Sequence, residues 1–352
     1  MTKIFALGAT GYIGSDALYE IAHAHPEYEI TCLVRNSDKG AQVASQYPKI
    51  KLVYGDLDSA ELITGESAKA DIVCNWANAD HVAASNAIAQ GLLTHSSINP
   101  AYWIHTSGTG ILLFSDLQRK VFGEASAHVY NDWDGIGEVT SLPDTAPHRN
   151  VDKIVLATGA GDNAAKVKTA IVCSPTIYGP GRGPGNQRSH QVPELARTTL
   201  ERGQGVKVGK GETYWTSVHV HDLSRVYLSL VEAAAAGGAP ATWGAEGYYF
   251  AENGDIVWGA VSELVATSAA KQGFIKDDTV VSVGPEEADT FTTWGSALWG
   301  ANSRARAVRA RKLFGWEPRA KTLEEEVEET VRVEAQKLGL VKGHAKVAAG
   351  EA

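Results

Sequence analysis

MTKIFALGATGYIGSD, residues 1–16, is the stretch that decides the fold. Lys3 to Leu7 is a short apolar run, long enough for one buried parallel strand. Gly8, Gly11 and Gly14 follow at a fixed spacing, and apolar residues then recur at helical spacing. A strand, a glycine turn and a helix in this order form the phosphate-binding corner of a dinucleotide fold.

Glycine suits such a turn because a side chain would stop the backbone from approaching the pyrophosphate. The phosphates then lie against the unpaired N–H groups and the positive dipole of the helix N-terminus. We therefore expect a Rossmann-type α/β fold, with a doubly wound parallel sheet and a smaller C-terminal substrate lobe. The residues expected to contact the cofactor at this corner are Gly8, Thr10, Gly11, Tyr12, Ile13 and Gly14.

Composition excludes several classes of function. The 352 residues carry a formal charge of −9, and 44% of them are hydrophobic. Such a chain buries a core, and its charge argues against nucleic acid or an anionic membrane as the main partner. No apolar run approaches the length of a membrane span, so we expect a cytoplasmic protein. The partner that we expect is a small-molecule substrate. The sequence does not decide whether the protein forms a homodimer.

The three cysteines, Cys32, Cys74 and Cys173, each lie in an apolar run that is typical of a strand. Buried, unreactive thiols are therefore expected. No pair of cysteines has the spacing of metal ligands, and no histidines have the HExxH form. The sequence predicts no metal site.

The pattern GATGYIG at residues 8–14 resembles the short-chain dehydrogenase/reductase superfamily, specifically its extended and atypical branches of proteins similar to nucleotide-sugar epimerases. The resemblance runs from residue 3 to about residue 338. It is carried further by P-x-x-Y-G-P-G at residues 175–181, V-x-V-x-D-L at residues 218–223 and LFGWEPR at residues 313–319. It implies an enzyme that binds a nicotinamide dinucleotide.

We expect residues 1–190 to form the dinucleotide-binding domain, with residues 204–236 returning to it. Residues 191–203 and 237–340 would form the substrate lobe, and residues 341–352, which are small and polar, a flexible tail. Residues 114–147 show no sustained periodicity. An insert of this size is either part of the substrate pocket or a surface excursion.

The predicted second strand runs from Glu29 to Val34, and Arg35 is the first residue after it. An acidic residue here would hold the ribose 2′-hydroxyl, whereas arginine suits a 2′-phosphate, so Arg35 favours NADP(H) over NAD(H). The alternative is an arginine that stacks on adenine or faces solvent. The resemblance implies that Asp56 contacts the adenine, although it could instead cap a helix. The other cofactor contacts that we expect are Asn36, Leu57, Ala77, Thr106, Lys153, Pro175 and Ile177.

Members of this superfamily carry a tyrosine and a lysine four residues apart: the lysine binds the nicotinamide ribose and the tyrosine transfers a proton. This chain reads HRNVDK at residues 148–153, with Lys153 present and Arg149 in the tyrosine position. A guanidinium keeps its protons at any accessible pH, so Arg149 cannot replace tyrosine. Two cations on one face of a helix would favour an anion in the site.

The resemblance also implies a serine or threonine after the fifth strand that binds the substrate oxygen. By register this position falls on Gly108, so Ser107 or Thr109 would have to substitute, unless the segment is only a polar turn. Candidate proton donors are His148, Tyr130, Tyr178 and water held by Ser107 or Thr109. The expected catalytic set is Ser107, Thr109, Arg149, Lys153 and Tyr178.

Three functions fit these expectations. The first is an NADP-dependent oxidoreductase that acts on a small organic carbonyl, imine or activated alkene without a tyrosine–lysine pair. The second is an isomerase, epimerase or lyase that retains its cofactor, and the third is a regulatory protein that senses NADP without turnover. Fold does not decide among them, because function resides in the site.

Overall fold

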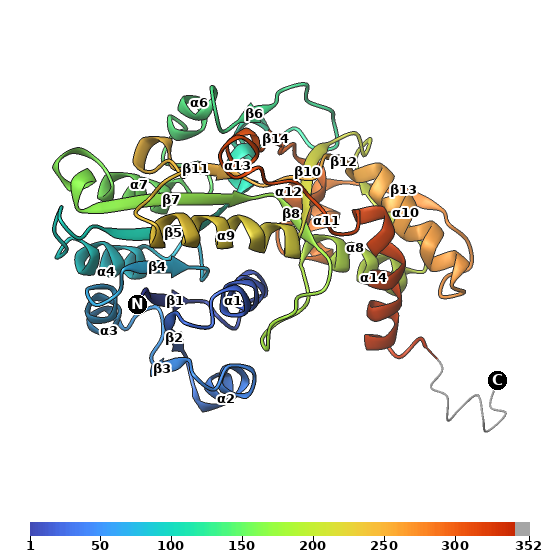
Figure 1. Cartoon of the computed structure of the whole chain (residues 1–352). Helices are drawn as coiled ribbons and strands as arrows, with labels where there is room; N and C mark the ends of the chain where they lie inside the picture. The colour runs from blue at the N-terminus through green and yellow to red at the C-terminus, as the bar shows by residue number, and fades with distance from the viewer. Residues whose placement is uncertain (342–352) are drawn as a thin grey trace.

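The computed structural model describes residues 1–341 and centres on a seven-stranded sheet of order β11-β7-β5-β4-β1-β2-β3 (Figure 1). All pairings in this sheet are parallel. Its strands are β1 (Lys3–Leu7), β2 (Glu29–Val34), β3 (Lys51–Tyr54), β4 (Ile72–Asn75), β5 (Ala101–Gly108), β7 (Val167–Ser174) and β11 (Tyr248–Phe250). The order reverses between β1 and β4, and doubly wound sheets bind ligands at the carboxyl ends beside such a switch. The expected fold class is confirmed.

Helices cover both faces of the sheet, because parallel strands are joined by crossover connections. These helices are α1 (Tyr12–Ala24), α2 (Ser37–Gln46), α3 (Ala60–Ser67), α4 (Val82–Leu92), α7 (Arg149–Thr158) and α9 (Val220–Ala235). On one face α1 packs against α9, and on the other α4 packs between α3 and α7. The strands are therefore buried on both sides, which explains their continuous apolar sequences.

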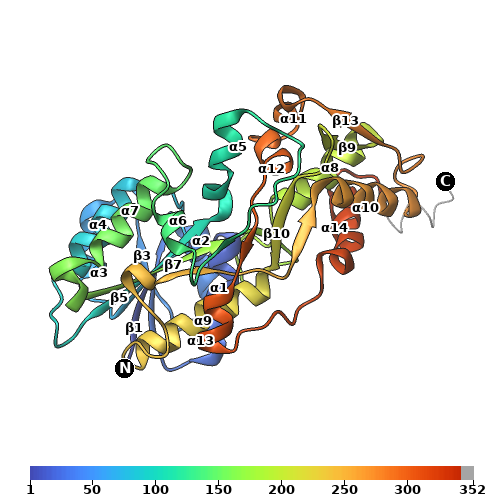
Figure 2. The same cartoon turned by 90° about the horizontal axis from the view of Figure 1, so that it is seen from above.

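A second apolar cluster is built mainly from later segments of the chain. Its helices are α8 (Gln191–Arg202), α10 (Trp258–Lys271), α11 (Pro285–Phe291), α12 (Gly295–Gly300) and α14 (Leu323–Lys337). Figure 2 shows these helices grouped on one side of the molecule, away from β1 and β3. Smaller sheets accompany them, formed by β8 (Thr176–Tyr178), β9 (Gly205–Val208), β10 (Tyr214–His219), β12 (Asp255–Val257) and β13 (Val280–Val283).

The two clusters divide the chain differently from the expected domain boundaries. The helix α9 packs on the main sheet, whereas β9, also within residues 204–236, packs in the second cluster. Conversely, β11 joins the main sheet although residues 237–340 were expected in the lobe. The helix α13 (Val308–Phe314) also contributes to the first cluster. Apolar periodicity identifies a buried face but not the core against which that face packs.

β5 and the insert that follows it both form regular structure. β5 runs as far as Gly108, because its pairing with β7 extends to Ser174. The insert of residues 114–147 contains α5 (Phe114–Arg119), β6 (Tyr130–Asn131) and α6 (Ile136–Thr140), and β6 pairs with β14 (Ala305–Arg306). These elements are too short to show periodicity. Apart from residue 341, the expected tail lies outside the described residues.

Cys32, Cys74 and Cys173 are buried on β2, β4 and β7, and all three thiols are free, as expected. Within residues 1–341, no helix has both the length and the apolar character needed to cross a membrane.

Candidate cofactor and active site

The glycine turn between β1 and α1 is packed too closely for side chains at two positions. Gly8 has φ of 82°, and a Cβ there would lie 2.5 Å from the Trp76 carbonyl carbon. A Cβ on Gly14 would meet the Gly8 carbonyl oxygen at 2.3 Å. A Cβ on Gly11 would meet only that oxygen, at 3.2 Å, among the described atoms within 4 Å, and Gly11 lines a cavity. The fold therefore requires Gly8 and Gly14, whereas Gly11 leaves room for a ligand.

This cavity, of about 600 Å³, extends from the glycine turn along the carboxyl ends of β2, β3 and β4. Its size and position suit the adenosine and phosphate part of a dinucleotide. The expected cofactor contacts that line it are Gly8, Thr10, Gly11, Arg35, Asp56, Leu57 and Ala77. The lining residues that sequence reasoning missed are Leu33, Val34, Lys39, Gly55, Asp58, Trp76, Asn78, His81 and Asn186.

Two cations, the exposed Arg35 and the half-buried Lys39, line the end of the cavity next to β2. Paired cations suit a phosphate group. The signal for Lys39 was present in the sequence, because this residue lies four positions after Arg35, in the first turn of the helix that begins at Ser37. The expected contact Asn36 instead caps α2, since its Oδ1 accepts a hydrogen bond from Lys39 N at 3.0 Å.

Asp56 lines the cavity and also organises the turn before α3. Its Oδ1 accepts hydrogen bonds from the Ser59 hydroxyl and from Asp58 N, each at 3.0 Å. The hydrogen bond from Ser59, followed by that from Asp58, lowers the pKa of Asp56. The carboxylate therefore stays ionised and is able to accept a further hydrogen bond.

The segment between β8 and α8 descends beside α1 in Figure 1 and meets the glycine turn. Asn186 N donates to Thr10 O at 3.0 Å, which brings Asn186 to the edge of the cavity. The Tyr12 hydroxyl donates to Gly179 O at 2.5 Å. Tyr12, expected to contact the cofactor, is thus engaged in holding this segment.

Asp16 anchors the same segment from inside α1. The fully buried carboxylate accepts hydrogen bonds from the Arg182 guanidinium at 2.7 and 3.1 Å, from Arg182 N at 2.8 Å and from the Ser224 hydroxyl at 2.6 Å. Burial alone would raise the pKa of Asp16, but the hydrogen bonds from Arg182 and Ser224 outweigh it and hold the pKa below its usual range. Sequence reasoning missed this anchor, because its members are distant along the chain.

The hydroxyls at the end of β5 point to opposite faces of the sheet. Thr106 Oγ1 lies 2.6 Å from the Tyr227 hydroxyl of α9. Ser107 faces α7, where its hydroxyl lies beside Asp152 without closing a hydrogen bond. The Tyr248 hydroxyl donates to Asp152 Oδ2 at 3.1 Å. Burial raises the pKa of Asp152 to about 6, although the neighbouring Ser107 hydroxyl lowers it.

The structure does not bring Tyr178 to this point. Its hydroxyl donates to Lys321 O at 3.0 Å, its side chain packs in the second apolar cluster, and burial raises its pKa to about 12. Thr109 is buried just after β5, and its hydroxyl has no hydrogen-bond partner among the described residues.

Some of the expected cofactor contacts do not line the first cavity. They are Tyr12, Ile13, Gly14, Asn36, Thr106, Lys153, Pro175 and Ile177.

Arg149 and Lys153 are turned towards the insert. Arg149 Nε donates to Leu142 O at 3.0 Å, and its Nη2 donates to Thr140 O. Lys153 Nζ donates to both carboxylate oxygens of Asp144, at 2.7 and 2.9 Å. The anion that Lys153 meets is thus an acidic side chain of the insert, one of the anions that two cations on this helix would favour. This geometry gives no support to Lys153 as the anchor of the nicotinamide ribose. Successive helical residues are about 100° apart around the axis, so an assignment shifted by one residue changes the face.

The residues that α7 and its N-cap turn inwards are His148, Val151, Asp152 and Val155. His148 Nδ1 lies 2.9 Å from Asp80 Oδ1, in the connection that follows β4. Sequence reasoning considered His148 as a proton donor but missed Asp80. The available signal was the spacing of His148 and Asp152, four residues apart but one residue earlier than the expected pair.

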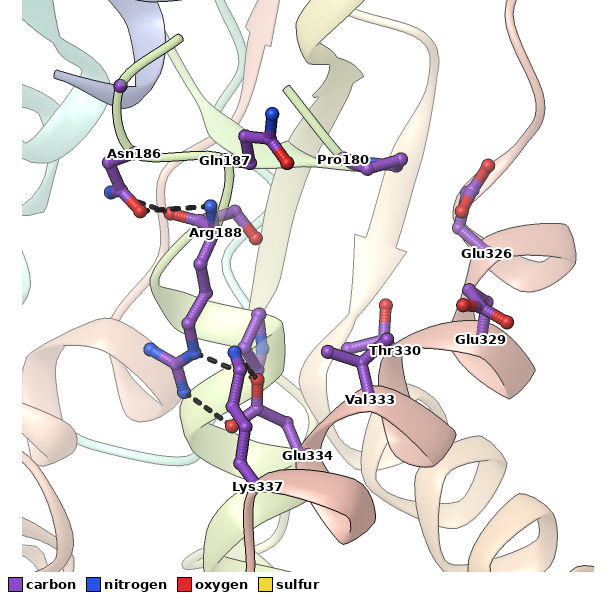
Figure 3. A pocket seen from close by; sticks show the side chains of 14 residues that line it. Pro180, Asn186, Gln187, Arg188, Glu326, Glu329, Thr330, Val333, Glu334 and Lys337 are labelled. Atoms are coloured by element: carbon purple, nitrogen blue, oxygen red, sulfur yellow. Dashed lines mark hydrogen bonds and ion pairs between the residues drawn. The ribbon is translucent and has the colours of Figure 1, made fainter. Parts of the chain in front are cut away.

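A second cavity, of about 590 Å³, lies between the segment after β8 and α14 (Figure 3). Asn186 borders both cavities. Figure 3 shows Arg188 extended towards Glu334, with Nε donating to Oε1 at 2.9 Å. Lys337 pairs with the same carboxylate at 2.8 Å. Ion pairs thus engage much of the charge that lines this cavity.

Among residues 1–341, no cluster of side chains has the composition to hold a metal ion.

The model of the NAD dependent epimerase/dehydratase family matches residues 4–244. The chain is 39% identical over 345 residues to a protein of Acremonium sp named oxidase ucsJ, covering 96% of this chain and 99% of that protein.

Two solved structures share the fold. The dTDP-glucose 4,6-dehydratase DesIV of Streptomyces venezuelae, with NAD bound, has a TM-score of 0.65 at 16% identity and covers 97% of this chain and 99% of its own. The UDP-glucose 4-epimerase of Thermotoga maritima, with UDP-glucose, has a TM-score of 0.64 at 14% identity and covers 96% of this chain and 100% of its own.

Proposed function

The chain belongs to the NAD dependent epimerase/dehydratase family, and we propose that it is an NADP(H)-dependent oxidoreductase of the extended short-chain dehydrogenase/reductase type. Its substrate is a small organic carbonyl, imine or activated alkene, or the reduced form of one. The observation that carries the proposal is the cavity beside the glycine turn with Arg35 and Lys39 at its far end.

The residues present fit a bound dinucleotide. Gly8 and Gly11, at the N-terminus of α1, would receive the pyrophosphate. Arg35 and Lys39 would hold a 2′-phosphate. The Asp56 carboxylate would accept a hydrogen bond from the adenine amino group. Bound NADP(H) supplies hydride transfer, and the protein supplies its binding and orientation. The relative named as an oxidase supports redox chemistry over isomerisation.

Calorimetry tests the cofactor preference. We expect NADP(H) to bind at least tenfold more tightly than NAD(H), about 1.4 kcal/mol. Arg35→Ala combined with Lys39→Ala should remove most of that difference, whereas Lys49→Ala, which removes an exposed cation outside the cavity, should not. Equal affinities in the unmodified protein would contradict the NADP assignment.

Turnover tests the reaction class. The protein is incubated with NADPH and a panel of ketones, imines and enones, and with NADP⁺ and their reduced forms. A stoichiometric change between oxidised and reduced cofactor supports the oxidoreductase. Turnover without net cofactor change would indicate the isomerase or lyase instead, and binding without turnover would indicate a sensor.

A further inference from the structure

His148 has an unusual backbone conformation for its residue type. It precedes the first residue of α7 with φ of 63° and ψ of −15°, in the left-handed region. Residues with a Cβ rarely adopt this conformation, and they persist in it where their surroundings hold them, often at functional sites. The His148 carbonyl accepts from Asp152 N at 3.1 Å, so the first turn of α7 helps to hold this conformation.

The ring of His148 is oriented by a carboxylate. With Nδ1 2.9 Å from Asp80 Oδ1, a neutral ring that donates from Nδ1 presents Nε2 as an unprotonated acceptor. The hydrogen bond from His148 lowers the pKa of Asp80, so this carboxylate stays ionised at neutral pH. Nε2 itself has no hydrogen-bond partner among the described residues, and 24% of the side chain is exposed.

Two glycines make room for Nε2 at the carboxyl end of β5. A Cβ on Gly108 or Gly110 would lie 3.1 or 3.0 Å from this nitrogen. The ring therefore lies over the segment where the resemblance places the group that contacts substrate. Asp80 lies between Asn78 and His81, which both line the cofactor cavity, so the pair stands at the border of that cavity.

The other titratable or charged groups around the ring do not compete for Nε2. His105, on β5, is buried, and burial lowers its pKa to about 3, so this ring stays neutral. Asp152, on α7, is engaged by Tyr248. Arg149 is bonded to carbonyl groups of the insert.

We propose that His148, held by Asp80, is the group that exchanges a proton with the substrate, in place of the absent tyrosine. This inference rests on the proposed function. In the reductive direction, the substrate carbon receives a hydride, the C=O or C=N π electrons move to the heteroatom, and that atom takes the proton from Nε2. The imidazolium becomes neutral. In the oxidative direction, neutral Nε2 takes the proton while the hydride leaves the carbon. Asp80 is a positioning residue that fixes the tautomer and stabilises the imidazolium.

A chemical test needs no substrate. Diethyl pyrocarbonate modifies accessible imidazole nitrogens, and peptide mass spectrometry follows each histidine separately. We expect saturating NADP⁺ to slow modification of His148 at least tenfold, whereas adenosine 2′,5′-bisphosphate, which lacks the nicotinamide, slows it less than twofold. His128, which is half exposed and lies outside the cavity, should be unaffected by either.

The outcomes separate the two proposals. If calorimetry shows that NADP⁺ binds but His148 reacts at an unchanged rate, the inference is overturned and the proposed cofactor stands. If NADP⁺ does not bind at all, the proposed function fails, and the inference fails with it. Equal protection by NADP⁺ and the bisphosphate would place His148 at the adenosine end and contradict its role.

Kinetics on any substrate from the panel give the second test. His148→Gln should lower kcat at least about 100-fold, as expected for loss of a general acid–base group, with NADPH affinity within about twofold. Added imidazole should restore part of the rate in His148→Ala, which a merely structural role would not allow. His128→Gln serves as the control.

Asp80→Asn tests the positioning role. Loss of the carboxylate should lower kcat at least about tenfold while KM and NADPH affinity stay within about twofold, because Nδ1 no longer has an ionised acceptor that fixes the tautomer. Full kcat in His148→Gln or in Asp80→Asn would overturn the inference.

Discussion

At the scale of single residues, Gly11 and Gly14 belong to one turn, but their missing side chains have different consequences. Gly11→Val should weaken NADP(H) binding at least about 100-fold while leaving the circular dichroism spectrum nearly unchanged, because its Cβ would project into the cavity. Gly14→Val is the contrasting variant. Its Cβ would overlap the Gly8 carbonyl, so we expect a loss of about 3 kcal/mol or more in unfolding free energy. Normal binding by Gly11→Val would show that this corner is not the site.

Asp152 gives a prediction about pH. Its pKa is raised to about 6 by burial, so its ionisation costs stability as pH rises from the unfolded value near 3.9 through 6. Asp152→Asn removes that cost and retains an acceptor for the Tyr248 hydroxyl. The variant should therefore gain about 1–3 kcal/mol relative to the unmodified protein at pH 7.5, and this gain should shrink as pH falls below 6. Urea unfolding at pH 5 and 7.5 measures both values, and a gain that does not change with pH would contradict the account.

At the scale of elements, α7 presents one face to the sheet and the other to the insert. Lys153→Ala removes a salt bridge to Asp144. The lysine side chain is about half exposed and the aspartate side chain is mostly exposed. We expect little change in stability, because solvent screens the pair, and no change in NADP(H) affinity by calorimetry. Asp144→Ala is the matched control, because it breaks the same pair from the insert. A tenfold loss of cofactor affinity in Lys153→Ala alone would restore this lysine to the nicotinamide site.

At the scale of the whole molecule, the buried Asp16 carboxylate joins α1, α9 and the segment that leads into the second cluster. Arg182→Ala would leave this carboxylate buried without its cation, so we expect a loss of about 3–5 kcal/mol in unfolding free energy at pH 7. Arg332→Ala breaks an exposed pair with Glu329 and should cost far less, because solvent screens such a pair. Urea unfolding compares the two variants, and equal losses would mean that the anchor contributes no more than a surface pair.

Local sequence determined the dinucleotide corner, because every requirement of a strand, a glycine turn and a helix is met by neighbouring residues. Local sequence also determined that Arg35 lines the cavity, because this residue directly follows a parallel strand and such strands end at the ligand edge of the sheet. The buried cysteines were predictable for the same reason, as each lies in an apolar run that both layers of helices cover.

Only the tertiary structure decided which residues face the candidate site. Lys153 and Arg149 matched a spacing, but the starting point of α7 and the carbonyls of the insert turn both side chains away. Asp80 and His148 are 68 residues apart and meet only because β4 and α7 are assembled on one sheet. A periodic pattern fixes which residues share a face, whereas the direction of that face depends on packing between distant segments, which no local pattern contains.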